Sequence, residues 1–335
     1  MLRFWGWVLF FAVLIMPSVE TAANNEFRKS IRIVGSSTVF PFSAYVAEKY
    51  HRKTGIASPV VESTGSGGGI KMFCAGIGKQ HPDIVTASRR MKISEVHKCV
   101  DHKITSIGEV MIGWDGIILA VARHAQPFEI SQKILFKALA RKLPIDGQWV
   151  NNPHTKWNHI DPALPEQPIQ VFGPPPTSGT RDVFVEEVML KACRQLLQQP
   201  DIDKRLCGDL RDDGHYIDAG EDDDLIVRRL NNNAQAIGIL GYNAAMRREN
   251  LIKPLSVNAI APSFETILDA TYPLSRPLFL YVKNEHIKVL PNIQDYLDEF
   301  LSEQAIGEEG YLVEKGLIPL LNKNAGPRVL NLSLQ

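Results

Sequence analysis

Short apolar runs and helix-forming segments alternate along the chain. Runs typical of buried strands occur at 31–34, 60–61, 83–86 and 169–172. Each is followed by a turn rich in small or hydroxyl residues, and then by a segment with apolar residues at helical spacing. The repeated order of strand, turn and helix predicts an α/β fold with parallel strand pairing.

The second half of the chain continues this pattern less regularly. Two longer apolar strands, near 111–121 and 277–282, are placed to cross between two domains. We therefore predict domain I from 24–115 with 278–335, and domain II from 116–277. Residues 143–168 and 207–224 are predicted to be irregular. Further helices are predicted at 131–141, 182–198, 225–230, 242–249 and 291–301, with a strand at 236–240.

Three predicted helices begin in turns rich in glycine and hydroxyl residues, at 35–41, 63–70 and 177–182. The first N–H groups of a helix have no partner within the helix, and together with the helix dipole they bind oxyanions. A single serine or threonine before a helix is usually only an N-cap. Three such starts, two near the N-terminus and one in domain II, favour an anion held from both sides of a cleft.

Catalytic motifs do not fit these turns. A Gly-x-Ser-x-Gly elbow fails because Thr64 and Pro176 stand where its first glycine is required. The nucleotide-binding pattern Gly-x-x-x-x-Gly-Lys-Ser/Thr fails because Ile70 precedes Lys71 and Met72 follows it. A dinucleotide fingerprint would also need glycine at Ile70. The serines are therefore interpreted as hydrogen-bond donors, and we predict no enzyme activity.

The amino-acid composition indicates a globular protein and argues against nucleic acid and metal ions as ligands. The 335 residues exceed one ordinary core, and 44% apolar with 22% charged residues is typical of globular proteins. The 37 basic and 37 acidic residues give no net charge, so a nucleic-acid partner is not expected. No His-Glu-x-x-His or Cys-x-x-Cys occurs, so we predict no metal site and no cofactor. The acidic run 222–224 is interpreted as a helix start rather than a calcium loop.

The N-terminal segment resembles an export signal. Arg3 precedes an apolar run at 5–16, Pro17 ends it, and 21–23 are small enough for cleavage after Ala23. The run is short for a bilayer span, although an uncleaved anchor is the alternative. We predict a signal peptide at 1–23 and a periplasmic or extracellular mature protein.

Four cysteines suit an oxidising compartment. Three pairings are possible, and we predict the local ones, Cys74–Cys99 and Cys193–Cys207.

The glycine and hydroxyl turns carry a specific resemblance. Segments 35–41, 64–71, 83–89 and 177–182 resemble the binding segments of periplasmic phosphate-binding proteins that serve phosphate ABC importers. Segments 236–242 and 272–278 also resemble later parts of that family, in order along the chain. The resemblance implies the two-lobed type II periplasmic binding protein fold. Each lobe would be a mixed, mostly parallel sheet flanked by helices, and a two-strand hinge would close both lobes over one oxyanion.

The resemblance also implies the phosphate ligands, with Ser88 and Arg181 as secondary candidates. The principal candidates are Ser37, Thr38, Val39, Gly65, Ser66, Ser178, Gly179 and Thr180. Arg89 is a further principal candidate, as our own hypothesis rather than one that the resemblance implies.

Two positions depart from the family pattern. Many relatives have an aspartate after Ala-Ser that accepts the proton of hydrogen phosphate, and this chain has Arg89 there. Many have an arginine four residues before Ser-Gly-Thr, and this chain has Pro174. We predict that Arg89, with Arg181, supplies the charged contact. The alternative is that Arg89 pairs with an acidic neighbour outside the site.

The function predicted from these features is capture of inorganic phosphate by a monomer that delivers it to a membrane ABC permease complex. Alternatives are another tetrahedral oxyanion (sulfate, arsenate or molybdate) or a phosphate-sensing paralogue. A secreted phosphatase is a remote alternative.

Overall fold

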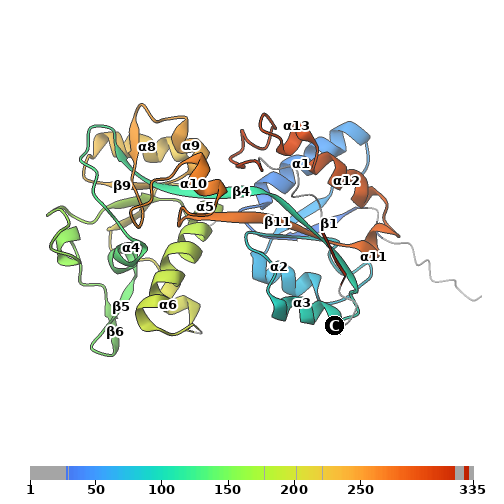
Figure 1. Ribbon diagram of the computed structural model, residues 1–335, viewed down its shortest axis with the longest axis horizontal. Coiled ribbons are helices and arrows are strands. Elements are labelled where there is room, and N and C mark those ends of the chain that lie inside the picture. The colour runs from blue at the N-terminus through green and yellow to red at the C-terminus, as the bar shows by residue number, and fades with distance from the viewer. Residues whose placement is uncertain are drawn as a thin grey trace, which may run out of the picture.

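The computed structural model describes residues 28, 30–176, 178–200, 202–220 and 222–320, and the backbone of 328–331. The predicted signal peptide lies outside these residues. Figure 1 shows two lobes joined by two long strands, β4 (Ser106–Ala122) and β11 (Ser275–Lys283). The fold is a mixed α/β fold in which helices flank one continuous twisted sheet, so the predicted fold class is confirmed.

The sheet of lobe I has the strand order β2-β1-β3-β11-β4. β1 (Arg32–Gly35), β2 (Val60–Ser63) and β3 (Ile84–Ala87) pair in parallel, as the strand-turn-helix pattern predicted. β11 runs antiparallel to β3 and β4. The C-terminal strand β12 (Arg328–Asn331) pairs with the first residues of β4.

Helices cover both faces of this sheet because its strand residues alternate between two cores. Ile33 lies in one core and Val34 in the other, and Leu280 and Tyr281 divide in the same way. One face is covered by α1 (Phe40–Thr54), α11 (Asn284–Ile287), α12 (Asn292–Phe300) and α13 (Glu303–Ile306), and the other by α2 (Ser66–Phe73) and α3 (Ile93–Asp101).

Lobe II continues the same sheet in the order β4-β9-β7-β8. β9 (Ile237–Gly241), β7 (Val171–Gly173) and β8 (Tyr216–Asp218) are parallel to one another, and β10 (Ile252–Pro254) pairs with β4. Its core takes all but one of its buried members from 117–274. The surrounding helices are α4 (Gln132–Leu139), α7 (Lys204–Gly208), α8 (Asp223–Asn232), α9 (Tyr242–Met246) and α10 (Phe264–Leu268).

One long helix runs from the interlobe face into lobe II. It comprises α5 (Gly179–Val183), a π-helical segment (Phe184–Leu190) and α6 (Lys191–Leu197) without a break. The predicted helix at 182–198 therefore begins three residues earlier, at Gly179, directly after Ser178. This start places the glycine and hydroxyl turn of lobe II opposite lobe I.

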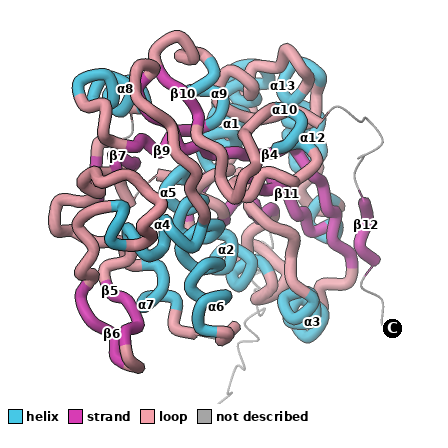
Figure 2. Tube along the Cα trace, turned by 60° about the vertical axis from the view of Figure 1, so that its left-hand side comes forward, coloured by secondary structure: helices cyan, strands magenta, loops and turns pink. Residues whose placement is uncertain are grey.

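The prediction that 143–168 is irregular was incomplete. Figure 2 shows a hairpin there, formed by β5 (Lys142–Ile145) and β6 (Gln148–Asn151). Asp146 and Gly147 have φ values of 49° and 77°, as the two-residue turn of a hairpin requires. A short 3₁₀ helix (Trp157–His159) follows and buries Trp157. The Asp-Gly pair was the signal for this hairpin.

The irregular prediction for 207–224 was also incomplete, because β8 and part of α7 lie within it. The interpretation of the acidic run is confirmed, since Asp222 caps α8 by accepting a hydrogen bond from the N–H of Asp224 at 2.9 Å. The structure also contains both predicted disulfides, Cys74–Cys99 and Cys193–Cys207.

We expect the Cys193–Cys207 disulfide to stabilise lobe II. Both cysteines are fully buried, and their separation of 14 residues closes a short loop in the unfolded chain. Replacing both with alanine should lower the free energy of unfolding by about 3 kcal/mol, because the unfolded chain regains conformational entropy. Urea denaturation of the two proteins measures this difference. Unchanged stability would contradict the prediction.

Candidate functional site

The carboxyl ends of β1, β2 and β3 meet at one edge of the lobe I sheet, because the three strands are parallel. Ser66, which follows β2, and Ser88, which follows β3, are joined there: their hydroxyl oxygens are 3.1 Å apart, and the N–H of Ser88 donates to Ser66 Oγ at 3.1 Å. The turn of α2 lies directly on β1, since a Cβ on Gly69 would be 2.5 Å from the Cα of Gly35. The two predicted turns are therefore packed together.

The third predicted turn reaches lobe I from the other side. Thr38 Oγ1 donates to the carbonyl oxygen of Gly179 at 3.4 Å, and Ser37 donates a hydrogen bond to the Asp182 carboxylate. A Cβ on Gly179 would lie 2.7 Å from the Cα of Thr38, so a glycine is required for this approach. The starts of α1 and α5 thus meet across the two lobes.

The starts of α1, α2 and α5 lack the side-chain caps that other helices of the protein have. Among the described residues, α1, α2 and α5 begin without a hydrogen bond from a capping side chain. By contrast, Ser131, Asp222 and Ser263 cap α4, α8 and α10 in this way. The simple capping role therefore does not account for the hydroxyl residues before α1 and α5. The first-turn N–H groups of α5 can instead serve an anion. At α1 the N–H of Phe40 already donates to the carbonyl oxygen of Ser36, and Pro41 has no N–H.

A buried arginine on the hinge joins the two helix starts. Arg276 on β11 is 2% exposed, and its guanidinium donates to Thr38 Oγ1 and, at 3.4 Å, to the carbonyl oxygen of Gly179. It also forms an ion pair of 2.8 Å with Glu186 of the long helix. Arg276 lies opposite Asp115 in the β4–β11 ladder. It is therefore the cation that touches both lobes at their meeting point.

The sequence analysis did not single out Arg276. Its signal was a charged residue within the segment 272–278, at the start of an otherwise apolar strand. Burying a charged side chain costs free energy unless hydrogen-bond or ion-pair partners surround it. A single arginine in an apolar strand is therefore a signal of such a buried, paired charge.

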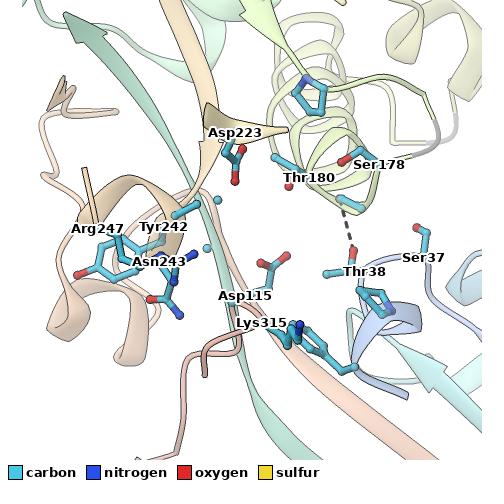
Figure 3. A pocket seen from close by; sticks show the side chains of 18 residues that line it. Ser37, Thr38, Asp115, Ser178, Thr180, Asp223, Tyr242, Asn243, Arg247 and Lys315 are labelled. Carbon is cyan, nitrogen blue, oxygen red and sulfur yellow. Dashed lines mark hydrogen bonds between the residues drawn. The ribbon is translucent and has the colours of Figure 1, made fainter. Parts of the chain in front are cut away.

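A cavity of about 300 Å³ lies between the lobes beside these contacts (Figure 3). Five predicted ligands line it. The lining residues from lobe I and the hinge are Ser37, Thr38, Pro41, Phe42, Asp115, Gly116, Lys315 and Gly316, and those from lobe II are Pro174, Ser178, Gly179, Thr180, Asp223, Gly241, Tyr242, Asn243, Ala244 and Arg247.

Other predicted ligands lie outside the cavity lining. Gly65, Ser66 and Ser88 are at the neighbouring strand ends, and the side chain of Val39 is fully buried in the lobe I core. Gly65, Ser66 and Ser88 therefore lie at the carboxyl edge of the lobe I sheet but do not line the cavity.

Arg89 and Arg181, the two arginines predicted to contact the anion, form interactions outside the cavity. Arg89 donates twice to the Glu95 carboxylate, at 2.8 and 2.9 Å, which is the arrangement of the alternative interpretation. Arg181 donates to the Pro174 carbonyl at 3.3 Å and lies 4.3 Å from the ring centre of Tyr216. Neither lines the cavity, so their placement does not favour them as contacts. Arg276 occupies the position between the lobes instead.

The cavity holds charges of both signs. Burial raises the pKa of the Asp115 carboxyl above its ordinary value, and Arg276 opposes this shift. Burial also raises the pKa of Asp223 to about 6. Arg247 and Lys315 contribute positive charge.

Two further observations concern the described part of the chain. No group of three or more His, Cys, Asp or Glu side chains there could hold a metal ion. No helix there is long and apolar enough to cross a membrane.

Comparison with known proteins gives consistent results. Residues 20–304 match the family model described as a PBP superfamily domain. The chain is 30% identical over 312 residues to the protein SphX of Synechococcus elongatus, covering 91% of this chain and 81% of that protein. It is 26% identical over 295 residues to the phosphate-binding protein PstS of Staphylococcus saprophyticus, covering 87% and 80% of the two chains.

Solved structures agree with this match. The crystal structure of a possible phosphate binding protein from Planctomyces limnophilus has a TM-score of 0.70 and 26% identity, covering 89% of this chain and 95% of that one. An ABC-type phosphate transport receptor from Vibrio cholerae shares the fold, with a TM-score of 0.61 and 20% identity over 88% of this chain and all of that one.

We expect Arg276 to be required for stability in the absence of any ligand. Arg276→Met should lower the free energy of unfolding by about 3 kcal/mol, because Asp115 loses the cation beside it. Arg141→Met is the control, since Arg141 pairs with Asp212 in solvent and should contribute less than about 1 kcal/mol. Urea denaturation compares them.

The loss in Arg276→Met should also depend on pH. The pKa of Asp115 in the folded variant lies above its unfolded value, so the folded state binds the additional proton. Stability of the variant relative to the parent should therefore fall as pH rises above about 4, the ordinary pKa of an aspartate in the unfolded chain. Equal losses for both arginine variants, or a loss independent of pH, would contradict this account.

Proposed function

The chain belongs to the PBP superfamily, and we propose that it is an exported protein that binds inorganic phosphate between its lobes and delivers it to a membrane ABC importer. The observation that carries this proposal is the meeting of Thr38 and Gly179, at two uncapped helix starts, beside buried Arg276. The names of the relatives PstS and the Vibrio cholerae receptor support phosphate as the ligand and ABC transport as the process.

In the proposed binding site, uncharged hydrogen-bond donors and one arginine hold the phosphate. Main-chain amides at the starts of α1 and α5 and the hydroxyls of Thr38, Ser178 and Thr180 would surround the phosphate oxygens. Arg276 would neutralise part of its charge. Hydrogen bonds to a charged group contribute roughly 1.5–3 kcal/mol each, so several of them can offset desolvation and give micromolar or tighter binding.

We propose that 24–115 with 278–335 and 116–277 are the two domains, and that β4 and β11 are the hinge. The separate cores of the two lobes support this division. A one-residue bulge in the β4–β11 pairing near Leu278 lies at the lobe I end of the crossing. A ligand that contacts both lobes favours their closed arrangement, which the importer would recognise.

Binding is favoured over hydrolysis by the lining of the cavity. Of the described residues that line it, none is a histidine that could activate Ser178 or Thr180 as a nucleophile. The proposal therefore includes no bond-breaking step. Turnover of a phosphate ester by the purified protein would favour the secreted phosphatase instead.

The departures at Arg89 and Pro174 support testing a second ligand class. With Arg89 paired to Glu95, the charge set of this site differs from the pattern of the resembled family. Sulfate, arsenate and molybdate are therefore the competitors to test, and a sensing paralogue would bind phosphate without supporting transport.

We expect phosphate-stripped protein to bind phosphate with micromolar or tighter affinity in calorimetric titration. Thr38→Val should weaken binding by about 10- to 100-fold, because a hydroxyl at the ligand is replaced by a methyl group of the same shape. Thr54→Val is the matched control, since the Thr54 hydroxyl donates to the carbonyl oxygen of Tyr50 and accepts from the N–H of Ile56 at the far end of the same helix, and it should leave affinity unchanged. Equal affinities for all three proteins would remove Thr38 from the site.

We also propose that the leader is cleaved. When the full chain is expressed with its export signal, the mature protein should begin at Asn24, because Ala23 ends the small-residue segment. Intact-mass measurement of the periplasmic or secreted protein gives this directly. A membrane-bound product that retains Met1 would support the anchor instead.

A further inference from the structure

Beyond β4 and β11, the described part of the chain passes between the lobes once more, near its C-terminal end. Leu317 is fully buried in the lobe I core, whereas the next residue, Ile318, is fully buried in the lobe II core. The chain therefore moves from one apolar interior to the other between two consecutive residues. Residues 313–318 are called the C-terminal strap below.

The strap is bonded to β4 at the point where that strand crosses between the lobes. The N–H of Trp114 donates to the carbonyl oxygen of Ile318 at 2.8 Å, and the N–H of Ile318 donates to the carbonyl oxygen of Trp114 at 2.9 Å. A Cβ on Gly113 would lie 2.6 Å from the Ile318 carbonyl oxygen, so a glycine is required for this approach. Pro277 of β11 also pairs with Trp114. The strap is therefore part of the same crossing as the two hinge strands.

An asparagine of lobe II also binds the strap. Asn243, in the first turn of α9, donates from its side-chain amide to the carbonyl oxygen of Leu317 at 3.2 Å and to that of Val313 at 3.5 Å. An amide group carries two N–H donors, so one side chain can bond to both carbonyls. Because Val313 and Leu317 precede the crossing, both hydrogen bonds run between the lobes.

The strap also contributes to the wall of the cavity. Lys315 lines the cavity, and Figure 3 shows it with Asn243 of lobe II on one side and Thr38 of lobe I on the other. Its ammonium nitrogen is 4.7 Å from the ring centre of Tyr45 in α1, a favourable position for a cation. The strap is therefore held by lobe I at Tyr45 and by lobe II at Asn243, and both Lys315 and Asn243 are on the cavity wall.

We propose that the C-terminal strap is a third connection between the lobes that opposes their separation, with Asn243 and Ile318 as the positioning residues that attach it to lobe II. This attachment consists of two hydrogen bonds and one buried side chain, so it can be released, whereas the main chain of β4 and β11 can only bend. Rotation of α9 away from lobe I would break both Asn243 hydrogen bonds. The cavity therefore widens only when the strap leaves lobe II.

Such a connection raises the affinity for a ligand that needs both lobes. This part of the inference rests on the proposed function, whereas the effect of the strap on lobe separation does not. A ligand of this kind binds only those molecules whose lobes are together, and its apparent dissociation constant increases as their fraction falls. Releasing the strap should therefore weaken phosphate binding, although no group proposed to hold the anion has been removed.

Small-angle X-ray scattering of the phosphate-stripped mature protein measures lobe separation without any ligand. Asn243→Ala and Ile318→Ala should each have a larger radius of gyration than wild-type protein, because the attachment to lobe II is weakened. Calorimetric titration with inorganic phosphate should show binding about 3- to 10-fold weaker in Asn243→Ala, the range that one ordinary hydrogen bond contributes.

Asn152→Ala is the matched control. The side-chain amide of Asn152 donates to the carbonyl oxygens of Lys137 and Ala140, both at 2.8 Å, and all three residues belong to lobe II. Its loss should lower the free energy of unfolding in urea and leave the radius of gyration and the phosphate affinity as in wild-type protein. A purely structural role for Asn243 would give this same pattern. If Ile318→Ala does not fold, Asn243→Ala still decides the inference.

The possible results separate the strap from the ligand. Equal radii of gyration for wild-type protein and folded Asn243→Ala overturn the inference, even if affinity falls, because Asn243 would then act only at the cavity wall. A larger radius with unchanged phosphate affinity overturns the link between strap and ligand. A larger radius with weaker binding supports both. A larger radius in the variant, with no phosphate binding by wild-type protein, supports the strap and overturns the proposed function instead.

Discussion

The structure depends on one buried guanidinium placed where two lobes meet. Arg276 is almost fully removed from solvent, which would be costly without partners, and its partners come from three places: Thr38 in lobe I, Glu186 in lobe II and Asp115 on the hinge. The relative position of the lobes is therefore coupled to the solvation of a single charge. A small anion entering beside it would join a network that already spans the cleft.

The sheet makes this coupling possible. β4 and β11 are continuous strands, yet the apolar side chains on them divide between separate cores. Each lobe therefore has its own apolar interior, and two strands connect the lobes. Asp115 and Arg276 lie opposite each other on those two strands. Charges at a crossing point of this kind affect the ligand and the hinge together, because moving one lobe changes the surroundings of both side chains.

The charged residues near the cavity differ in position from those of the resembled family. The sequence has Arg89 and Pro174 where the resembled family has an aspartate and an arginine, and the structure pairs Arg89 with Glu95. The cavity nevertheless has an arginine and an aspartate beside it, Arg276 and Asp115, supplied by the hinge strands. A binding site is defined by which groups converge in space, so the same pair of charges can reach it from different elements.

The sequence favoured the two disulfides as the local choice among three possible pairings. It determined by itself the local structure: parallel strands at 31–34, 60–61 and 83–86, and helix starts after Val39 and after Ser178. These follow from side-chain periodicity and backbone freedom, which are short-range properties. It missed the β5–β6 hairpin because an Asp-Gly turn within a Pro-rich stretch was not weighed. Only the tertiary structure decided that Thr38 contacts Gly179, that Arg89 pairs with Glu95, and that Asp115 lines the cavity beside Arg276. Thr38 and Gly179 are 141 positions apart and Thr38 and Arg276 are 238 apart, whereas Arg89 could pair with any of several partners. Burial and distance, which periodicity does not encode, determine which contact forms.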